Sequence, residues 1–255
     1  KKGLQVNKYS IGIVTFEHRF EKFFKPLIKQ IKEFRPDIEI MVAINGEYKA
    51  DFNQTYRADI LKFISEYSNI FPNIHPEFRS LAKLWNNLLI NASNHHVLLL
   101  NDDVSISNEA FFDALEGVLE SDGFFKINGS WSHTMLDRRI ISALNWFDER
   151  FLGVGEEDGD MEWQIGVQSD GGTIKSIQVP NIINHVDAEN VLQNIKKVNT
   201  KYTQFNLDFI HWHKYEIDPT DGQQYGINPR PLVLKNPKPP LHTTEPFYWE
   251  NRGEL

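Results

Sequence analysis

The first hundred residues alternate between short apolar runs and longer stretches in which apolar positions recur at helical spacing. Three apolar runs rich in β-branched or aliphatic residues predict strands at residues 9–16, 38–44 and 97–100. Three stretches with a helical period predict helices at residues 21–34, 55–67 and 79–92. Strands that alternate with helices in this way predict a mostly parallel sheet with right-handed crossovers.

The pattern changes in the second half of the chain. We predict a helix that starts near Glu109, strands at 124–132 and 174–179, and a helix at 191–215. From Pro219 onward, the last 37 residues hold seven of the twelve prolines but keep large residues such as Phe247 and Trp249. Because disordered tails lack such residues, we expect an extended segment that packs on the domain, with an interface to a partner or a membrane-bound acceptor as the alternative.

Composition narrows the class of protein. At 255 residues, 40% of them hydrophobic, the chain can bury a substantial core. Its net charge of -8 argues against nucleic acid as a partner. There is no cysteine, and no apolar run long enough for a membrane span or typical of a signal peptide. We therefore expect a cytoplasmic location, and the inner face of the membrane remains open.

One acidic site follows an expected strand. The apolar run at 97–100 ends in Asn101-Asp102-Asp103. A buried strand that stops at paired acids delivers carboxylates to the edge of the sheet where ligands of open α/β sheets bind. Such oxygen ligands suit Mg²⁺ or Mn²⁺ carrying a diphosphate. The alternative is a turn in which Asn101 or Asp102 caps the helix near Glu109.

A second acidic site follows a glycine-rich turn. Residues 147–160 read Phe-Asp-Glu-Arg-Phe-Leu-Gly-Val-Gly-Glu-Glu-Asp-Gly-Asp, with four acids between Glu156 and Asp160. Acids on a turn that opens a helix keep their negative charge, because the helix N-terminus stabilises it. A carboxylate held there is placed to take a proton from a hydroxyl. The alternative is a solvated loop with helix-capping acids.

Together the two motifs resemble the GT-A glycosyltransferases, especially those of family 2, over roughly residues 9–190. That family has an Asp-x-Asp metal motif at a strand end and a Phe-Asp-Glu-x-Phe signature followed by Glu-Asp-x-Asp. The resemblance implies an α/β GT-A fold with a Rossmann-like, mostly parallel sheet flanked by helices. It implies a domain at 1–190, with a nucleotide-sugar half at about 1–104, an acceptor half at about 105–190, and a C-terminal extension at 191–255.

The resemblance also implies a divalent metal, Mn²⁺ or Mg²⁺. Asp103 matches the last position of the metal motif and is the first choice of ligand, with Asp102 in the middle. Asn101 departs from the family pattern, since an Asp stands there in the family. His185, which follows the last expected strand, matches a histidine that completes the metal site in several relatives; its alternative is a structural role.

Five further residues match the nucleotide side of the family more loosely. They are Thr15, Glu17 and Arg19 after the first strand, Asn45 after the second, and Asn86 in the helix before the metal strand. A hydroxyl and amides of this kind suit the hydrogen-bonding edge of a base. Turn and cap chemistry is the alternative for each of them.

On the acceptor side, the resemblance makes Asp158 the general base and Glu157 the residue that orients the acceptor, with Asp160 as an alternative base. Trp131 and Trp146 are candidates for stacking on a sugar ring or for core packing. The implied reaction is inverting transfer from a nucleotide sugar, expected to be a UDP-sugar, to a saccharide or lipid-linked saccharide acceptor in bacterial surface polysaccharide biosynthesis. Peripheral membrane association and the oligomeric state are left open.

Two other functions remain. A nucleotidyltransferase also sets acids and Mg²⁺ beside an α/β sheet, but it usually has a glycine-rich basic loop after the first strand. At that place this chain has Thr-Phe-Glu-His-Arg at residues 15–19, which argues against this class. The other alternative is a non-catalytic protein that has the same fold and binds a saccharide or nucleotide. It stays an alternative because Asn101 stands where the metal motif of the family has an Asp.

Overall fold

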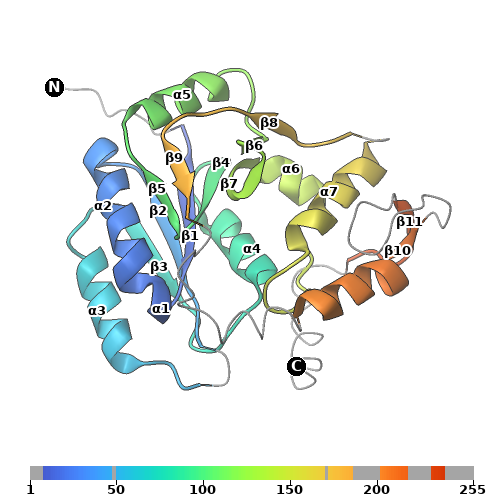
Figure 1. Ribbon diagram of the computed structural model, residues 1–255, viewed down its shortest axis with the longest axis horizontal. Coiled ribbons are helices and arrows are strands. Elements are labelled where there is room, and N and C mark those ends of the chain that lie inside the picture. The colour runs from blue at the N-terminus through green and yellow to red at the C-terminus, as the bar shows by residue number, and fades with distance from the viewer. Residues whose placement is uncertain (1–7, 48–49, 170–171, 186–201, 218–230, 239–255) are drawn as a thin grey trace. The chain divides into compact units, whose positions relative to one another are not determined.

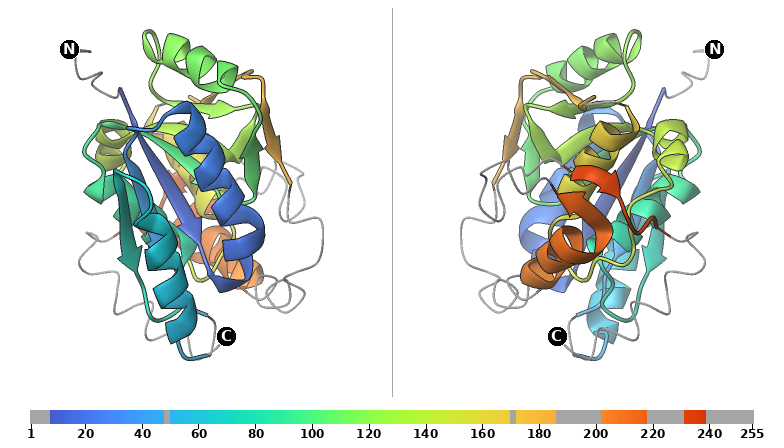
Figure 2. Two further views of the ribbon diagram at one scale, coloured as in Figure 1. Left: turned by 90° about the vertical axis from the view of Figure 1, so that its left-hand side faces the viewer. Right: turned by 90° about the vertical axis from the view of Figure 1, so that its right-hand side faces the viewer.

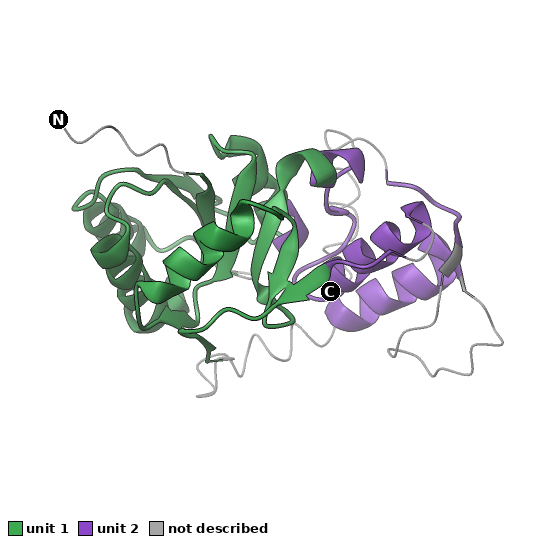
Figure 3. Cartoon of the chain, turned by 90° about the horizontal axis from the view of Figure 1, so that it is seen from above, with its two compact units in different colours: residues 1–79, 84–140, 175–192 green, residues 80–83, 141–174, 193–255 purple. Residues whose placement is uncertain are grey.

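The computed structural model describes residues 8–47, 50–169, 172–185, 202–217 and 231–238. The chain forms two compact units (Figure 3). Unit 1 comprises residues 1–79, 84–140 and 175–192, and unit 2 comprises residues 80–83, 141–174 and 193–255. The domain boundary expected at residue 190 lies outside the described residues and stays a prediction.

Unit 1 is built around one seven-stranded sheet. Its strands are β1 (Ser10–Thr15), β2 (Ile40–Ile44), β3 (Ile70–Ile74), β4 (His96–Asn101), β6 (Phe125–Ile127), β7 (Ser130–Asp137) and β8 (Lys175–Ile177). The order across the sheet is β3-β2-β1-β4-β7-β6-β8. The first four strands are parallel, β7 is antiparallel to both β4 and β6, and β8 is parallel to β6. The expectation of a mostly parallel α/β sheet is confirmed.

One face of the sheet is covered by three helical segments (Figures 1 and 2). The first runs through α1 (Glu17–Arg19), the π-helical segment η1 (Phe20–Phe24) and α2 (Lys25–Phe34), and the others are α3 (Gln54–Ile64) and α5 (Ala110–Leu119). Their apolar side chains form one core with inward-facing residues of the strands, among them Ile11 and Ile13. Burial of this continuous apolar face is the main source of the unit's stability.

The helix α4 (Leu81–Asn91) packs against the other face. Gly12, between Ile11 and Ile13, points to that face because side chains alternate along a strand. A Cβ on Gly12 would lie 2.9 Å from Leu99 Cδ2 and 3.3 Å from Leu88 Cβ. Glycine at this position therefore leaves room for the close packing of Leu99 and of α4.

Several elements differ from the sequence prediction, and three of the differences concern the sheet and its first helix. β3 was not predicted, because it is an edge strand with exposed Phe71 and Pro72 instead of an apolar run. The expected strand at 124–132 is two strands, β6 and β7, joined by Asn128-Gly129 with φ of 52° and 76°. Two positive φ angles fit a tight hairpin turn of the kind that Asn-Gly favours. The helix expected at 21–34 begins earlier, at Glu17.

The segment after β4 does not cap the next helix. Asn108 does so instead, because its Oδ1 accepts a hydrogen bond of 2.8 Å from the backbone N–H of Ala110 in α5. The alternative role of Asn101 or Asp102 as the cap of this helix is therefore wrong. Residues 102–103 form a turn into β5 (Val104–Ile106), which pairs antiparallel with β9 (Ile182–Asn184).

Unit 2 contains α7 (Glu157–Gln168), a helical stretch at 202–208 that continues into the π-helical segment η2 (Phe209–Lys214), and the hairpin β10 (Tyr215–Ile217) and β11 (Pro231–Leu234). The short helix α6 (Arg138–Ala143) leads from β7 toward this unit. The helix predicted at 191–215 is confirmed from 202 to 214, and its first part lies outside the described residues. Most of the proline-rich segment also lies outside them. None of the described helices is long and apolar enough to cross a bilayer.

Candidate active site

The acid pair lies where two halves of the sheet diverge. β1 and β4 are parallel neighbours, but the chain continues from β1 toward β2 and from β4 toward β7. Such a point, at the carboxyl ends of the strands, is where ligands of open α/β sheets bind. Asn101 is the last residue of β4, and Asp102 and Asp103 form the turn that follows. The sequence prediction for the position of these residues is confirmed.

Both carboxylates are buried and share one cation. Asp102 is 1% exposed and Asp103 is 4% exposed. Arg19 Nη1 lies 2.7 Å from Asp102 Oδ1 and 3.3 Å from Asp103 Oδ2. The second oxygens, Asp102 Oδ2 and Asp103 Oδ1, have no hydrogen-bond partner among the described residues. Because a buried polar atom without a partner is costly, these oxygens indicate a ligand site.

Burial also changes the protonation of this pair. It raises the pKa of Asp102 to about 6, while the charge and hydrogen bond of Arg19 oppose the rise. Thr15 is buried at the end of β1, the strand next to β4. The energetic cost of an ionised Asp102 is therefore reduced by any additional cation at this edge.

His185 is brought to Asp103 through the backbone. The β5–β9 ladder ends at Val104 and Asn184, and the N–H of His185 donates to the carbonyl of Asp103 at 2.9 Å. The imidazole is exposed, and its Nε2 lies 2.9 Å from Ser105 Oγ. The side chain thus contacts Ser105 instead of the carboxylates, although its backbone lies beside them.

The remaining residues expected on the nucleotide side have different surroundings. Glu17 accepts a hydrogen bond of 2.6 Å from Asn53 Nδ2. The side-chain amide of Asn45 donates to the carbonyl of Arg79 at 3.0 Å and accepts from the N–H of Arg79 at 2.9 Å. These bonds hold the residue that follows β2 against the segment around Arg79. Asn86 is buried on α4. Of the expected residues in unit 1, the structure therefore gathers Thr15, Arg19, the acid pair and the backbone of His185.

Two residues near the acid pair had no signal in the sequence. Tyr56 of α3 is buried, its hydroxyl has no hydrogen-bond partner among the described residues, and burial together with the charge of Asp102 raises its pKa. His133 of β7 stands opposite Leu100, and burial lowers its pKa to about 4, so the imidazole is neutral. Both read as ordinary core positions of a helix and a strand, which is why the sequence did not identify them.

The second motif forms the start of α7 in unit 2. Gly153, Gly155 and Glu156 all have positive φ, at 58°, 128° and 72°. A side chain on Gly153 would collide with the ring of Tyr202, so this position needs glycine for space as well as for backbone geometry. Asn206 holds the same turn, because its amide pairs with the backbone of Leu152 and donates to the carbonyl of Gly155 at 2.7 Å.

The acids of this motif differ in their surroundings. Asp158 is partly exposed, and its Oδ1 accepts a hydrogen bond of 2.9 Å from the N–H of Gly159. Glu157 is buried, and its Oε2 accepts from the N–H of Gly155 at 2.8 Å. Burial, with the nearby charge of Asp158, raises the pKa of Glu157 to about 8. Asp158 is therefore the motif residue that is both accessible and at the first turn of the helix.

Two further acids of the motif, Asp148 and Asp160, are held in a buried ionic network. Lys214 Nζ lies 2.6 Å from both Asp148 Oδ2 and Asp160 Oδ1. Arg150 pairs with Asp148 at 2.8 Å, and the Tyr215 hydroxyl donates to Asp160 Oδ1 at 2.7 Å. Burial alone would raise the pKa of Asp148, but the charges of Lys214 and Arg150 hold it well below its usual range. Asp160 therefore anchors α7 and is not placed as a base.

Of the two aromatic candidates, Trp131 is engaged in packing. The Trp131 ring stacks on Trp85 of α4, with ring centroids 6.4 Å apart and planes at 22°. Trp146 has a positive φ of 66° and its carbonyl accepts a hydrogen bond from Lys238 Nζ. Stacking of either ring on a sugar stays a prediction.

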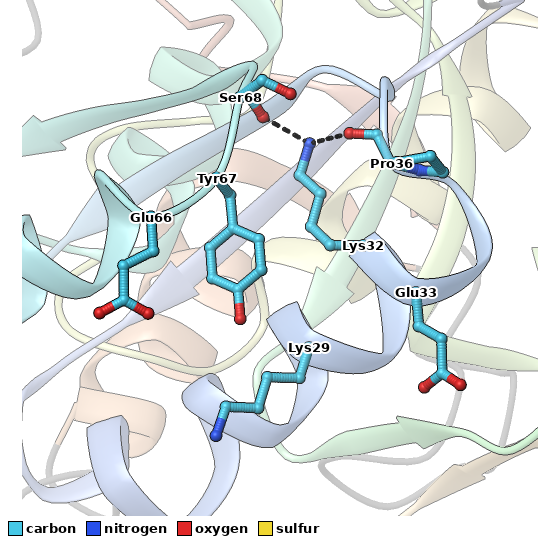
Figure 4. Close-up of a pocket in the computed structure, with 7 residues that line it drawn as sticks. All are labelled: Lys29, Lys32, Glu33, Pro36, Glu66, Tyr67 and Ser68. Atoms are coloured by element: carbon cyan, nitrogen blue, oxygen red, sulfur yellow. Dashed lines mark hydrogen bonds between the residues drawn. The ribbon is translucent and has the colours of Figure 1, made fainter.

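A pocket of about 390 Å³ elsewhere in unit 1 has a structural explanation (Figure 4). Lys32 Nζ donates to the carbonyls of Pro36, Ile38 and Ser68 at 3.1 Å, 2.8 Å and 2.7 Å. These bonds tie the segment before β2 to the segment before β3. The pocket thus lies where these strands begin, away from the strand ends that carry Asp102 and Asp103.

The raised pKa of Glu157 predicts a pH dependence of stability. The folded protein holds this proton up to a pH of about 8, whereas an unfolded Glu releases it near 4.5. The free energy of unfolding should therefore fall as pH rises from about 4.5 to about 8, by at most about 1.4 kcal/mol per pH unit for this proton. Urea unfolding of the parent and Glu157→Gln at pH 5, 6.5 and 8 measures this. The variant should gain stability relative to the parent as pH rises, and parallel curves would contradict the assignment.

Comparisons with solved structures support the α/β fold. No protein-family model matches the sequence, and no curated protein matches it. The mannosyltransferase PcManGT from Pyrobaculum calidifontis, solved in complex with GDP-Man and Mn²⁺, superposes with a TM-score of 0.56 at 10% identity, over 80% of this chain and 64% of that one. TarS from S. aureus superposes with a TM-score of 0.51 at 15% identity, over 68% of this chain and 35% of TarS.

These likenesses concern the fold. At identities of 10% and 15%, a similar structure does not establish a shared activity, because proteins with one fold can have many functions. The chain spans about a third of TarS and less than two thirds of the mannosyltransferase. The α/β fold expected from the sequence is thus the fold of a known glycosyltransferase.

Proposed function

We propose that this chain is a metal-dependent glycosyltransferase that moves a sugar from a nucleotide sugar to a saccharide acceptor with inversion at the anomeric carbon. The observation that carries the proposal is the buried pair Asp102 and Asp103 at the end of β4, each with one carboxylate oxygen that has no hydrogen-bond partner in the described part of the chain. The solved mannosyltransferase with a similar fold contains GDP-Man and Mn²⁺, which supports a donor and a metal of the same classes.

The residues present fit a divalent metal that is completed by its substrate. No group of three or more His, Asp or Glu side chains that could hold a metal occurs in the described ranges. Mg²⁺ and Mn²⁺ need fewer protein ligands, because one or two carboxylates plus substrate phosphates are a common arrangement. Asp103 would bind the metal, with Asp102 beside it and Asn101 and His185 as further candidate ligands. The metal would offset the charge that builds on the departing nucleoside diphosphate.

In unit 2, Asp158 would accept the proton of the acceptor hydroxyl. Its partial exposure and its position in the first turn of α7 support this role, because the helix N-terminus favours the ionised carboxylate. Glu157, which is buried and has a raised pKa, would orient the acceptor. Inversion follows from the use of a base in a single displacement, in which the acceptor attacks from the face opposite the leaving group.

The donor base and the acceptor are narrower parts of the proposal. The resemblance to family 2 favours UDP, whereas the mannosyltransferase binds GDP-Man. Thr15, Glu17, Arg19, Asn45 and Asn86 are the candidates for contacts with the nucleotide. The acceptor would be a saccharide or lipid-linked saccharide of a bacterial surface polysaccharide.

A non-catalytic nucleotide-binding protein on the same fold is the second candidate. The observation that favours it is Asn101, which replaces the first carboxylate of the metal motif. Isothermal titration with UDP and with GDP, each with and without Mn²⁺, tests the binding half of both candidates. We expect one nucleotide to bind more tightly with Mn²⁺, and no binding of either would contradict both candidates.

Asp103→Ala is expected to abolish the effect of Mn²⁺ on nucleotide binding. The variant removes the carboxylate best matched to the motif, and a charged hydrogen-bonding or ligand group of this kind contributes about 1.5–3 kcal/mol, or roughly 10- to 100-fold in affinity. Titration calorimetry measures it, with Asp113→Ala on the exposed face of α5 as the control that removes the same charge. Parental Mn²⁺ dependence in Asp103→Ala would place the metal elsewhere.

A further inference from the structure

We infer that Arg19 competes with the divalent cation for Asp102 and Asp103, so that metal binding is weak until a nucleotide arrives. The inference rests on the metal site of the proposed function and adds a regulatory role for one side chain of that site. It starts from the contacts of Arg19, whose guanidinium bridges the two carboxylates at 2.7 Å and 3.3 Å.

The guanidinium is held in this place by its surroundings. Arg19 is the last residue of the short helix α1, which begins two residues after the end of β1, and its side chain is 16% exposed. Its Cζ atom lies 5.2 Å from the ring centroid of Phe16 and 5.9 Å from that of Phe23. Aromatic faces attract a guanidinium at such distances. Arg19 is therefore positioned at the acid pair by packing as well as by charge.

The charges of the site are only half balanced. One guanidinium neutralises one of two buried carboxylates, and Asp102 Oδ2 and Asp103 Oδ1 have no hydrogen-bond partner among the described residues. The remaining negative charge attracts a cation. A divalent ion on the same carboxylates would, however, repel the guanidinium at short range in a poorly solvated site. Each cation therefore weakens the binding of the other, which is the basis of the competition.

A nucleoside diphosphate would relieve this conflict. Its phosphate oxygens are anionic partners for a guanidinium, which pairs with phosphate as well as it does with carboxylate. Arg19 could then exchange its carboxylate partners for phosphate, and the carboxylates would be free for the metal. Metal and nucleotide would thus bind with positive coupling, and this coupling must be reciprocal.

The test is a titration of the protein with MnCl₂ in the absence of nucleotide. The proteins are the parent, Arg19→Gln, Arg19→Lys and the control Lys22→Gln, which removes the same charge from the adjacent π-helical segment. We expect Arg19→Gln to bind Mn²⁺ about tenfold or more tightly than the parent, within the usual range of coupling between sites. Arg19→Lys should be intermediate, because it keeps the positive charge, but an ammonium is more strongly hydrated than a guanidinium and pairs less well in a poorly solvated site.

Three results would overturn the inference. They are equal affinity in Arg19→Gln and the parent, weaker affinity in Arg19→Gln, or an equal gain in Lys22→Gln, which would reflect net charge alone. Circular dichroism of each variant checks the fold. The same titrations with UDP and GDP present separate the two proposals. A parent that binds Mn²⁺ with nucleotide, with no gain in Arg19→Gln, refutes only the competition, whereas no Mn²⁺ binding under any condition refutes the metal site as well.

Discussion

Replacing Asp158 by Asn is expected to lower sugar transfer by a factor on the order of 10² to 10⁴, the usual effect of losing a general base. The amide has nearly the same shape as the carboxylate and can keep the hydrogen bond from the N–H of Gly159. It cannot accept the proton of the acceptor hydroxyl. Donor binding should stay close to the parental value, because the variant changes none of the candidate donor residues.

Steady-state kinetics on three variants separates the roles of the acids. Glu157→Gln should lose less turnover than Asp158→Asn and more affinity for the acceptor. Asp160→Asn should lose stability, because it weakens the contacts of a buried carboxylate with Lys214 and Tyr215. A kcat for Asp158→Asn close to the parental value, with an intact circular dichroism spectrum, would contradict the mechanism as assigned.

Lys214→Met is expected to destabilise the protein by about 3–5 kcal/mol, the usual cost of removing one partner from a buried ion pair. Lys214 is 0% exposed and contacts both Asp148 and Asp160 at 2.6 Å. Asp148 keeps its pair with Arg150 in the variant, but Asp160 retains only the hydroxyl of Tyr215 as a partner among these groups. Urea unfolding followed by circular dichroism measures the loss.

Lys175→Met provides the matched control. Its ion pair with Asp122 has a similar length, 2.8 Å, but the Lys175 side chain is 74% exposed. Exposed pairs contribute about 0–1 kcal/mol, so this variant should unfold close to the parent. The double variant Lys214→Met with Asp160→Leu should recover part of the loss, because no uncompensated carboxylate remains. A loss below about 1 kcal/mol for Lys214→Met would contradict a structural role for the network.

Local signals predicted the sheet edge that carries the acid pair. The apolar run of β4 and the adjacent acids are consecutive in the sequence, so the end of the strand and the position of Asp102 and Asp103 could be inferred together. Arg19 was singled out through the resemblance, but its bridge to both acids spans more than eighty residues of sequence and has no local pattern. β3 was missed because an exposed edge strand with a proline lacks the apolar run of a central strand.

The roles of the acids in the second motif depend on contacts that the sequence does not show. Asp158 and Asp160 are two positions apart and so point about 200° apart on a helix. The two side chains therefore cannot both face the interior of the unit. Asp160 faces it because it pairs with Lys214, which is 54 residues away in the sequence. Lys214 lies within an aromatic cluster of the sequence. Because a lysine in a helix is usually exposed to solvent, nothing in the sequence indicated that Lys214 is buried. The buried ionic network therefore became visible only in the folded chain.

The most direct test of the proposed glycosyltransferase activity is the release of nucleoside diphosphate from a panel of UDP- and GDP-sugars. The protein is incubated with each donor and Mn²⁺, with and without a saccharide acceptor mixture, and with EDTA or Asp103→Ala as controls. We predict release from at least one donor that needs Mn²⁺ and is lost with EDTA and in Asp103→Ala. No release from any donor by the folded parent, or release unaffected by EDTA and by Asp103→Ala, would contradict the proposal.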